Sequence, residues 1–232
     1  MEDVKKNLFE TKRRIAKAAK RAGRNPDDIT LIAVSKTKPN EMIEEAISAG
    51  QFIFGENRVN ELKEKKDFFK ERASFHQIGT LQTNKVKYLI GRCDLIESVD
   101  STHLIDEISR LSVKKNVVTP ILIQINIGRE PQKSGVLPED IYNVLEYAAK
   151  AEGISVKGLM AIPPKCENPE DVRPYFKEMY NIFLDIRAKN IDNIYMDILS
   201  MGMTHDFETA IEEGSTSVRV GTGIFGKRDY MI

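Results

Sequence analysis

The stretch TLIAVSKTKPNEMIEEAISAG, residues 30–50, joins an apolar run directly to a segment of helical period. Residues 30–35 are mostly apolar or β-branched and stop at Lys36, which is typical of a buried strand that ends at a loop. From Asn40 onward, apolar residues recur at helical spacing. A strand followed at once by a helix is the unit of parallel sheets, because the helix carries the chain back to start the next strand. Whether this unit repeats therefore decides the fold.

The strand and helix unit recurs through the chain. Further strands are expected at residues 51–55, 74–79, 94–99, 119–127, 155–162, 194–200 and 217–223, separated by helical segments at residues 56–71, 83–92, 101–115, 137–153, 168–190 and 203–214. A basic helix is expected before them, at residues 2–22. Eight strands in this order favour a closed (β/α)8 barrel over an open doubly wound sheet. No Pro/Gly/Ser-rich linker divides the chain, so we expect one domain over residues 1–232.

Composition excludes several classes of protein. The chain has 232 residues, with 35 basic and 35 acidic side chains, so its net charge favours neither nucleic acid nor an anionic membrane as a partner. Cys93 and Cys166 form no metal-binding or disulfide pattern, which fits a reducing cytoplasm. The N-terminus is charged throughout and no apolar run is long enough to span a membrane, so we expect a soluble cytoplasmic protein.

Polar residues stand where the predicted strands end. Active sites of (β/α)8 barrels lie at the carboxyl ends of the strands, so these positions are candidates for a site. In chain order they are Lys36, Asn57, His76, Glu97, Ser98, Asn126, Met160, Ser200, Arg219, Gly221 and Thr222. Alternation along a strand places Ile32, Val34 and Lys36 on one face. If such faces point inward, an amine, a hydroxyl and a guanidinium meet over the barrel mouth.

Lys36 has a chemical use at such a place. Partial burial and a nearby cation lower the pKa of a lysine, and the neutral amine attacks an aldehyde to give a Schiff base. The alternative is a lysine that extends to solvent, as we expect for Lys38. The loops after strands seven and eight offer a phosphate site, because small residues let backbone N–H groups approach an anion. In these loops Thr204 is a candidate helix cap, and Gly221 with Thr222 opens a tight turn.

An aldehyde-reactive lysine beside a phosphate site fits two ligands. Pyridoxal 5′-phosphate (PLP) carries both matching groups, and a sugar-phosphate aldolase substrate also satisfies them. Arg219 helps to discriminate: an arginine beside the pyridine nitrogen of PLP keeps that nitrogen unprotonated and weakens the ring as an electron sink. A salt bridge of Arg219 remains the alternative. Among the other polar residues, we expect a hydrogen-bonded structural role for His76 and a solvated His205. Glu97 and Asp100 are expected to cap the helix that begins near Ser101, and the alternative is that they orient a lysine.

Six motifs support a family resemblance. AVSKTKP, FGENRVNEL, FHQIGTLQTNK, LIESVDS, GLMAIPP and LSMGMTHDFETAIEEGSTSVRVGTGIFG occur in this order and cover essentially the whole chain. Together they resemble the YggS/PROSC family of pyridoxal phosphate homeostasis proteins, whose fold is similar to the N-terminal barrel of alanine racemase. The resemblance implies that Lys36 forms the internal aldimine with PLP, that Arg219 faces the pyridine nitrogen and that Asn57 lies beside the ring or its oxygen. It implies that the phosphate is surrounded by Ser200, Met201, Gly221 and Thr222.

The resemblance also implies a function. Members of the family are cytoplasmic, mostly monomeric proteins that bind PLP and influence its supply, without an established catalytic turnover. We therefore expect a PLP carrier that holds the cofactor on Lys36 and hands it to apo-enzymes. A slow amino-acid racemase is the alternative. Alanine racemase takes its second base from a tyrosine of a C-terminal domain, and we expect no such base here, because the chain ends soon after the eighth strand.

Overall fold

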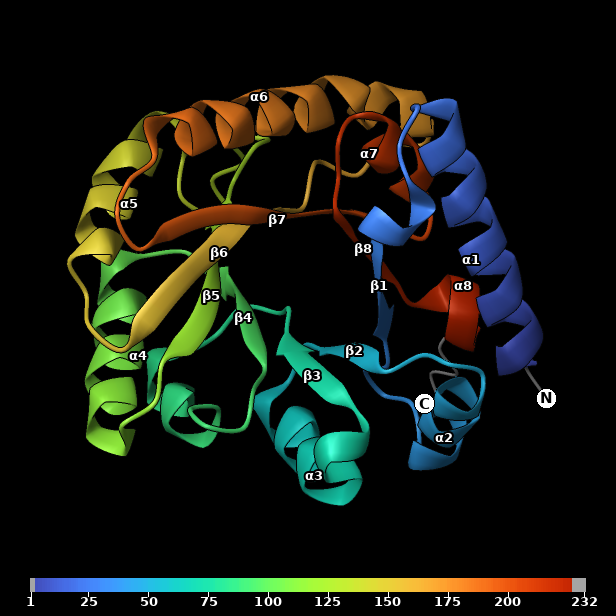
Figure 1. Cartoon of the computed structure of the whole chain (residues 1–232), viewed down its shortest axis with the longest axis horizontal. Helices are drawn as coiled ribbons and strands as arrows, with labels where there is room; N and C mark the ends of the chain where they lie inside the picture. The colour runs from blue at the N-terminus through green and yellow to red at the C-terminus, as the bar shows by residue number, and fades with distance from the viewer. Residues whose placement is uncertain (1–2, 227–232) are drawn as a thin grey trace.

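Eight parallel strands close into a barrel in this computed structural model, which describes residues 3–226 (Figure 1). The strands follow one another in chain order, and β8 pairs with β1 to complete the circle. Their bounds are β1 Thr30–Val34, β2 Ile53–Glu56, β3 Ser74–Gln77, β4 Leu95–Val99, β5 Thr119–Ile125, β6 Ile154–Ala161, β7 Ile194–Met203 and β8 Ser217–Val220. The predicted (β/α)8 barrel is confirmed, because closure leaves these strands without the two edges of an open sheet.

Helices surround the barrel, as the alternation of the sequence predicts (Figure 1). They are α1 Val4–Arg21, α2 Asn40–Ser48, α3 Val59–Phe69, α4 Thr102–Lys115, α5 Ile141–Ala149, α6 Arg173–Lys189, α7 Phe207–Glu212 and α8 Thr222–Phe225. The N-terminal helix α1 starts at Asp3, whose side chain accepts a hydrogen bond from Lys6 N, and packs against α7 and α8. No helix in residues 3–226 is long and apolar enough to cross a membrane.

Several elements differ from the sequence prediction. The predicted eighth strand, residues 217–223, ends at Val220, and Thr222 starts helix α8. Residues 83–92 were expected to form a helix between β3 and β4, but the chain forms only a short 3₁₀ helix, η3, over Thr83–Tyr88. Leu89 N bonds to Val86 O, and Gly91 turns the chain at a φ of 75°. Strand β7 runs on to Met203, past its predicted end at residue 200. Gly202 permits this, because its φ is 93° and a Cβ there would lie 2.5 Å from Ala210 Cβ.

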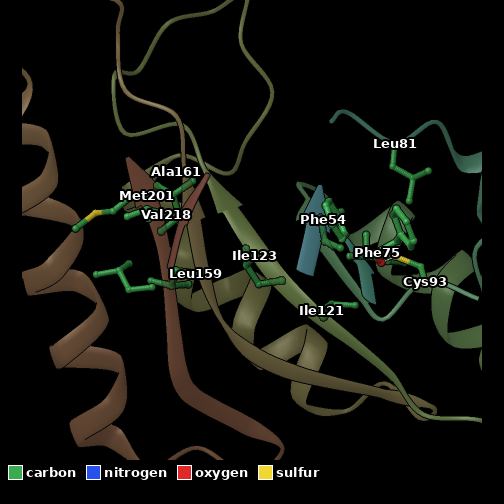
Figure 2. Packing of buried hydrophobic residues seen from close by; sticks show 14 of the residues in the cluster. Phe54, Phe75, Leu81, Cys93, Ile121, Ile123, Leu159, Ala161, Met201 and Val218 are labelled. Atoms are coloured by element: carbon green, nitrogen blue, oxygen red, sulfur yellow. Dashed lines mark hydrogen bonds between the residues drawn. The ribbon is translucent and has the colours of Figure 1, made fainter. Parts of the chain in front are cut away.

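Buried side chains form two layers, one outside and one inside the barrel. The outer layer lies between strands and helices, and Figure 2 shows part of it, with Phe54, Phe75, Ile121, Ile123, Leu159, Met201 and Val218. A smaller apolar cluster consists of Leu95, Leu122, Met160, Ile162 and Ile198. These residues alternate with outer-layer residues along their strands, so they face the barrel interior. The apolar side chains fill part of the barrel interior, and Ile162 among them also lines the cavity at the strand ends.

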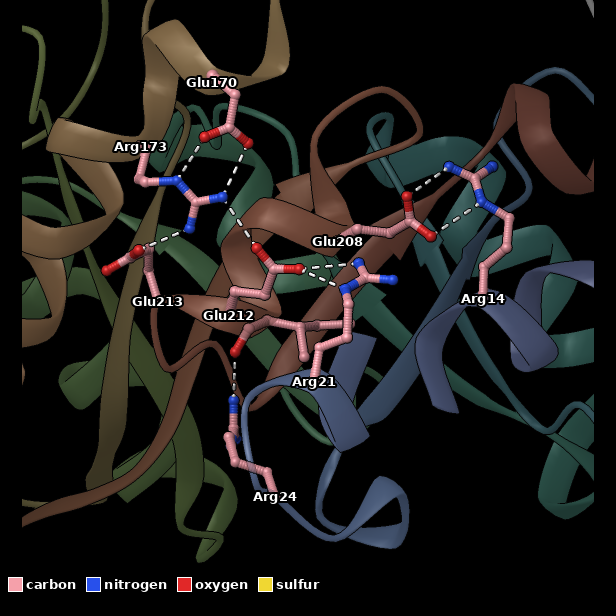
Figure 3. Close-up of polar contacts among 9 residues, drawn as sticks. Arg14, Arg21, Arg24, Glu170, Arg173, Glu208, Glu212 and Glu213 are labelled. Atoms are coloured by element: carbon pink, nitrogen blue, oxygen red, sulfur yellow. Dashed lines mark hydrogen bonds and ion pairs between the residues drawn. The ribbon is translucent and has the colours of Figure 1, made fainter. Parts of the chain in front are cut away.

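Ion pairs attach α1 and α6 to α7 and the residue that follows it (Figure 3). Arg21 and Arg173 both lie 2.8 Å from carboxylate oxygens of Glu212 on α7, and Arg173 also lies 2.7 Å from Glu213. Arg24 donates hydrogen bonds to two backbone carbonyls, those of Ile211 and Ser215. A network that joins several charges fixes geometry better than isolated surface pairs. It holds α7, and α7 follows the strand end at which the candidate site lies.

Candidate functional site

A cavity of about 370 Å³ opens at the carboxyl ends of the strands. Its lining comes from seven of the strands and the residues that follow them, all except β4, and consists of Val34, Lys36, Asn57, Ile78, Gly79, Thr80, Gln124, Ile162, Met203, Thr204, His205, Arg219, Gly221 and Thr222. Five of the seven predicted site residues are in this set: Lys36, Asn57, Arg219, Gly221 and Thr222. The other two, Ser200 and Met201, do not line the cavity.

Lys36 stands two residues beyond the end of β1. Its neighbour Thr37 has a φ of 64°, which β-branched residues rarely adopt, and Lys38 N bonds back to Ser35 O. This turn ends the strand, so the Lys36 side chain reaches the cavity above the inward-facing Val34. The sequence prediction that Val34 and Lys36 share a face is consistent with both residues lining the cavity.

A buried polar layer forms the floor of the cavity. His76 Nδ1 lies 2.8 Å from Glu97 Oε1, and Ser200 Oγ donates to Glu97 Oε2 at 2.6 Å. Arg219 donates to Ser200 Oγ at 2.5 Å and to the carbonyl of Ala161 at 2.8 Å. Four strands thus join through side chains inside the barrel. The layer fixes the guanidinium of Arg219, of which only 3% is exposed.

Glu97 carries the negative charge of this layer. Burial by itself raises the pKa of its carboxyl, but the hydrogen bond from His76 and the nearby charge of Arg219 outweigh burial and lower the pKa. The carboxylate is therefore ionised at neutral pH and balances Arg219, whose charge lies 3.9 Å away. The expected capping role of Glu97 is wrong, because Ser101 caps α4 by accepting from Leu104 N. The hydrogen-bonded role expected for His76 is confirmed.

Ser200 and Met201 lie below or outside the cavity because β7 is longer than predicted. Ser200 is fully buried, with its hydroxyl held between Glu97 and Arg219. The Met201 side chain points outward into the apolar layer between strands and helices (Figure 2). A side chain so placed leaves only the backbone of Met201 for contact with a ligand. The predicted phosphate contacts of these two residues stay predictions.

Gly221 and Thr222 form the wall expected to bind an anion. Thr222 starts α8, and the first residues of a helix have N–H groups without a partner inside the helix. Thr204 does not cap α7 as expected; its hydroxyl accepts from Gly221 N at 3.3 Å. The N-terminal residue before α7 is Asp206, whose carboxylate accepts from Met203 N. The loops after β7 and β8 are therefore bonded to each other beside the cavity.

Asn57 lies on the opposite wall, in contact with the loop after β3. Gln77 donates to the carbonyls of both Asn57 and Gly79, at 3.0 and 2.9 Å. A Cβ at Gly79 would lie 2.8 Å from Asn57 Cα, so only glycine permits this approach. Thr80, next to it, was not among the predicted site residues, yet it lines the cavity. Its position directly after a strand was the available signal.

His205 and Gln124 are further cavity residues that sequence reasoning missed. His205 was expected to be solvated near a helix start, and it is exposed, but it also lines the cavity. Gln124 belongs to β5 and donates to Ser134 O at 2.9 Å. Its alternation with Ile123 and Ile125 was a signal for an inward side chain.

The site can bind an anionic ligand that carries an electrophilic carbon. It offers a primary amine, a fixed guanidinium and backbone N–H groups around one cavity. A primary amine is the nucleophile that condenses with aldehydes, and backbone N–H groups at a helix start favour phosphate. The arrangement therefore supports covalent capture of a phosphorylated aldehyde.

Known proteins are similar to this chain over nearly its full length. The model of the family "Alanine racemase, N-terminal domain" matches residues 7–229. The pyridoxal phosphate homeostasis protein of Aquifex aeolicus is 47% identical over 218 residues, covering 94% of this chain and 95% of that protein. The protein of the same name from Escherichia coli K12 is 39% identical and covers 99% of each chain.

A solved structure agrees with these relatives. PipY of Synechococcus elongatus PCC7942, solved with PLP bound, is 31% identical, with a TM-score of 0.80 over 91% of this chain and 100% of that chain. These matches cover between 91% and 99% of this chain. The chain therefore belongs to the alanine racemase N-terminal domain family and, within it, to the pyridoxal phosphate homeostasis proteins.

Proposed function

We propose that this chain binds PLP in the cavity at the barrel mouth and takes part in intracellular PLP homeostasis. In this role it holds the reactive aldehyde on Lys36 and passes the cofactor to apo-enzymes. The observation that carries the proposal is that Lys36 lines one cavity together with Arg219 and the start of α8. The PLP bound to PipY and the name of the curated relatives support it.

The residues of the cavity fit the three reactive parts of PLP. When bound, PLP supplies an aldehyde carbon with which a neutral primary amine condenses, with loss of one water. Lys36 is the amine in this proposal. The backbone N–H groups of Thr222 and Gly223, which have no partner inside α8, suit the phosphate. The cavity volume of about 370 Å³ lies within the range of small-molecule sites.

Arg219 favours holding the cofactor over turnover. Its guanidinium is fixed by Ser200 and by the carbonyl of Ala161, so it cannot move away from a ligand ring in the cavity. An arginine stays charged at every physiological pH and has only hydrogen-bond donors, so it cannot accept a hydrogen bond from a protonated pyridine nitrogen. A pyridine nitrogen that faces it therefore stays unprotonated, which weakens the electron sink that racemisation needs.

A slow amino-acid racemase is the second candidate, and His205 is the observation that favours it. Racemisation needs an acid or base on each face of the substrate, and His205 lines the cavity in addition to Lys36. Exchange of the α-proton of amino acids in deuterium oxide would support the racemase. Failure of a full panel of amino acids to exchange would leave the carrier.

The experiment that tests the proposed function is an absorbance spectrum of the purified protein incubated with PLP. We expect a visible band, its loss on borohydride reduction, and a reduced cofactor attached to Lys36 in peptide mass spectra. Lys36→Ala should abolish the band, whereas the control Lys38→Ala should keep it. Absence of the band in the unmodified protein would exclude PLP. A sugar-phosphate aldolase would show no band without its substrate.

The partners and location follow from the same proposal. We propose that the protein acts as a monomer in the cytoplasm and that apo-enzymes dependent on PLP receive the cofactor. Light scattering after size exclusion tests the monomer. Reactivation of an apo-enzyme by the loaded protein, faster than by the PLP that it releases spontaneously, tests direct transfer.

A further inference from the structure

Three charged side chains, two of them buried, form a cluster beside the turn that carries Lys36. Glu56, at the end of β2, is fully buried, and Lys65 on α3 is only 6% exposed. Lys65 Nζ lies 2.7 Å from Glu56 Oε1 and 3.7 Å from Glu61 Oε2, one helical turn earlier. None of the three is needed to form the cavity floor, which has its own charged pair in Glu97 and Arg219.

The Glu56, Lys65 and Glu61 cluster contacts the backbone on both sides of Lys36. Before it, Ser35 Oγ donates to Glu56 Oε1 at 2.6 Å, and Lys65 Nζ donates to Ser35 O at 2.8 Å. After it, Thr37 N donates to Glu61 Oε2 at 2.8 Å. The cluster therefore holds both peptide groups that flank the proposed cofactor-binding lysine.

The turn held in this way is strained. Thr37 has a φ of 64°, in the left-handed region that a β-branched residue avoids. Such a conformation persists only where surrounding contacts enforce it, and it concentrates at functional sites. Glu61 supplies that contact, because its carboxylate accepts the Thr37 N–H. The strain has a use: it ends β1 so that Lys36 reaches the cavity.

The cluster also costs stability, which argues for a functional role. Glu56 Oε2 is buried and has no hydrogen-bond partner among residues 3–226. Burial, with a smaller contribution from the charge of Glu61, raises the pKa of Glu56 to about 7 in spite of the pairing with Lys65. An apolar replacement of such a pair is often neutral or stabilising. Retention of an unfavourable charge beside a site is typical of function.

We propose that Glu56, Lys65 and Glu61 are positioning residues for Lys36, which fix the Ser35 to Thr37 backbone and thereby preorganise its amine for the cofactor. This inference rests on the proposed function. An amine that is held in place loses less conformational entropy when it bonds to the aldehyde carbon of the cofactor. The bond between amine and cofactor therefore forms faster and breaks more slowly. The cluster therefore sets how tightly and how long PLP is held.

The first test compares release rates of PLP from three variants. Lys65→Met removes the buried cation but keeps its length, and Glu61→Ala removes the acceptor of Thr37 N–H. Lys66→Met is the matched control, because Lys66 is adjacent on α3 but pairs with Asp94 at 3.1 Å, away from Lys36. Each loaded protein is mixed with an excess of an aldehyde scavenger, and the decay of the visible band is followed. We expect release about tenfold faster in the first two variants and within about twofold of the unmodified protein in the control.

A second measurement uses the protein without cofactor, so that it stands apart from the proposed function. The exchange rate of the Thr37 amide hydrogen should rise in Lys65→Met and Glu61→Ala, and not in Lys66→Met. Unchanged release and unchanged exchange, relative to the control, would overturn the inference. If Lys65→Met does not fold, Glu61→Ala decides, since that side chain is 23% exposed. A missing band in the unmodified protein would refute the proposed function, whereas the exchange rates would still test the positioning.

Discussion

Glu56→Gln is the substitution from which we expect the clearest change in the pH dependence of stability. Glutamine keeps the length of the side chain and an oxygen that accepts from Ser35 and Lys65, but it cannot ionise. Burial raises the pKa of Glu56 to about 7 in the folded protein, from its ordinary value of 4.5. The substitution therefore removes one titrating group and leaves the contacts around it in place.

The sign follows from the number of protons that each state binds. Between pH 4.5 and about 7, Glu56 is protonated in the folded protein and ionised in the unfolded chain. Its contribution to the free energy of unfolding is therefore fully present below pH 4.5 and is lost as the pH rises through about 7. At 1.36 kcal/mol for each pH unit, the difference between the two pKa values corresponds to about 3 kcal/mol. In Glu56→Gln, the free energy of unfolding should not show this fall as the pH rises.

Urea unfolding of both proteins at pH 5, 6, 7 and 8 measures the effect. We expect Glu56→Gln to gain stability relative to the unmodified protein by about 2.5 kcal/mol between pH 5 and pH 8, since part of the full effect lies below pH 5. Subtracting one protein from the other cancels the titration of every other group, apart from its coupling to Glu56. A difference that stays constant to within about 0.5 kcal/mol would show that Glu56 does not titrate in this range, and would refute the reasoning.

Three further predictions concern the polar floor, the barrel wall and the surface network. Glu97→Gln should lower the free energy of unfolding by about 2 kcal/mol at pH 7. This difference should shrink below pH 4.5, because the pKa of Glu97 is lowered in the folded protein and its contribution to stability disappears as the pH falls. Urea unfolding at pH 7 and at acid pH measures both values. Gly158→Ala should lower the free energy of unfolding by about 2 kcal/mol or more, since the φ of Gly158 is 149° and the new Cβ would lie 1.8 Å from Ile198 O. A melting temperature equal to that of the unmodified protein would contradict this prediction. Arg173→Ala should lower the free energy of unfolding by about 1 kcal/mol at low salt and by less in 1 M salt, because it breaks contacts to three carboxylates. Arg110→Ala breaks one exposed ion pair and should have no measurable effect in the same thermal melts.

The sequence predicted the parts of the site that depend on strand ends alone. Lys36, Arg219 and Gly221 each follow or end a short apolar run, and all three line the cavity. Parallel strands bring their carboxyl ends to one face whatever the details of packing, so this prediction needed only the order of the elements. Ser200 failed to reach the cavity because β7 continues past it, and the sequence gives no clear signal for that continuation.

Long-range pairs and strand irregularities could not be predicted in this way. Between Ser200 and Met203, the pairing of β7 with β8 shifts its register, and Gly202 allows the shift. A shift of one residue turns every following side chain to the other face, so periodicity alone cannot say which residue points inward. The same limit applies to Glu97, which looked like a helix cap and instead balances a cation on β8.

The sequence by itself determined the class of fold and the lysine on which the proposed chemistry depends. The alternation of apolar runs and helical segments is visible in the local sequence, and it sets the order of the strands whose carboxyl ends form the barrel mouth. Only the tertiary structure decided which polar groups share a cavity, which form its floor, and which hold Lys36 from behind. Nothing in the sequence indicates that Glu56 and Lys65 are buried, yet both are, with Lys65 Nζ 2.7 Å from Glu56 Oε1. The physical reason is that burial and charge pairing arise between elements distant in sequence, and their energies depend on the register and packing of those elements.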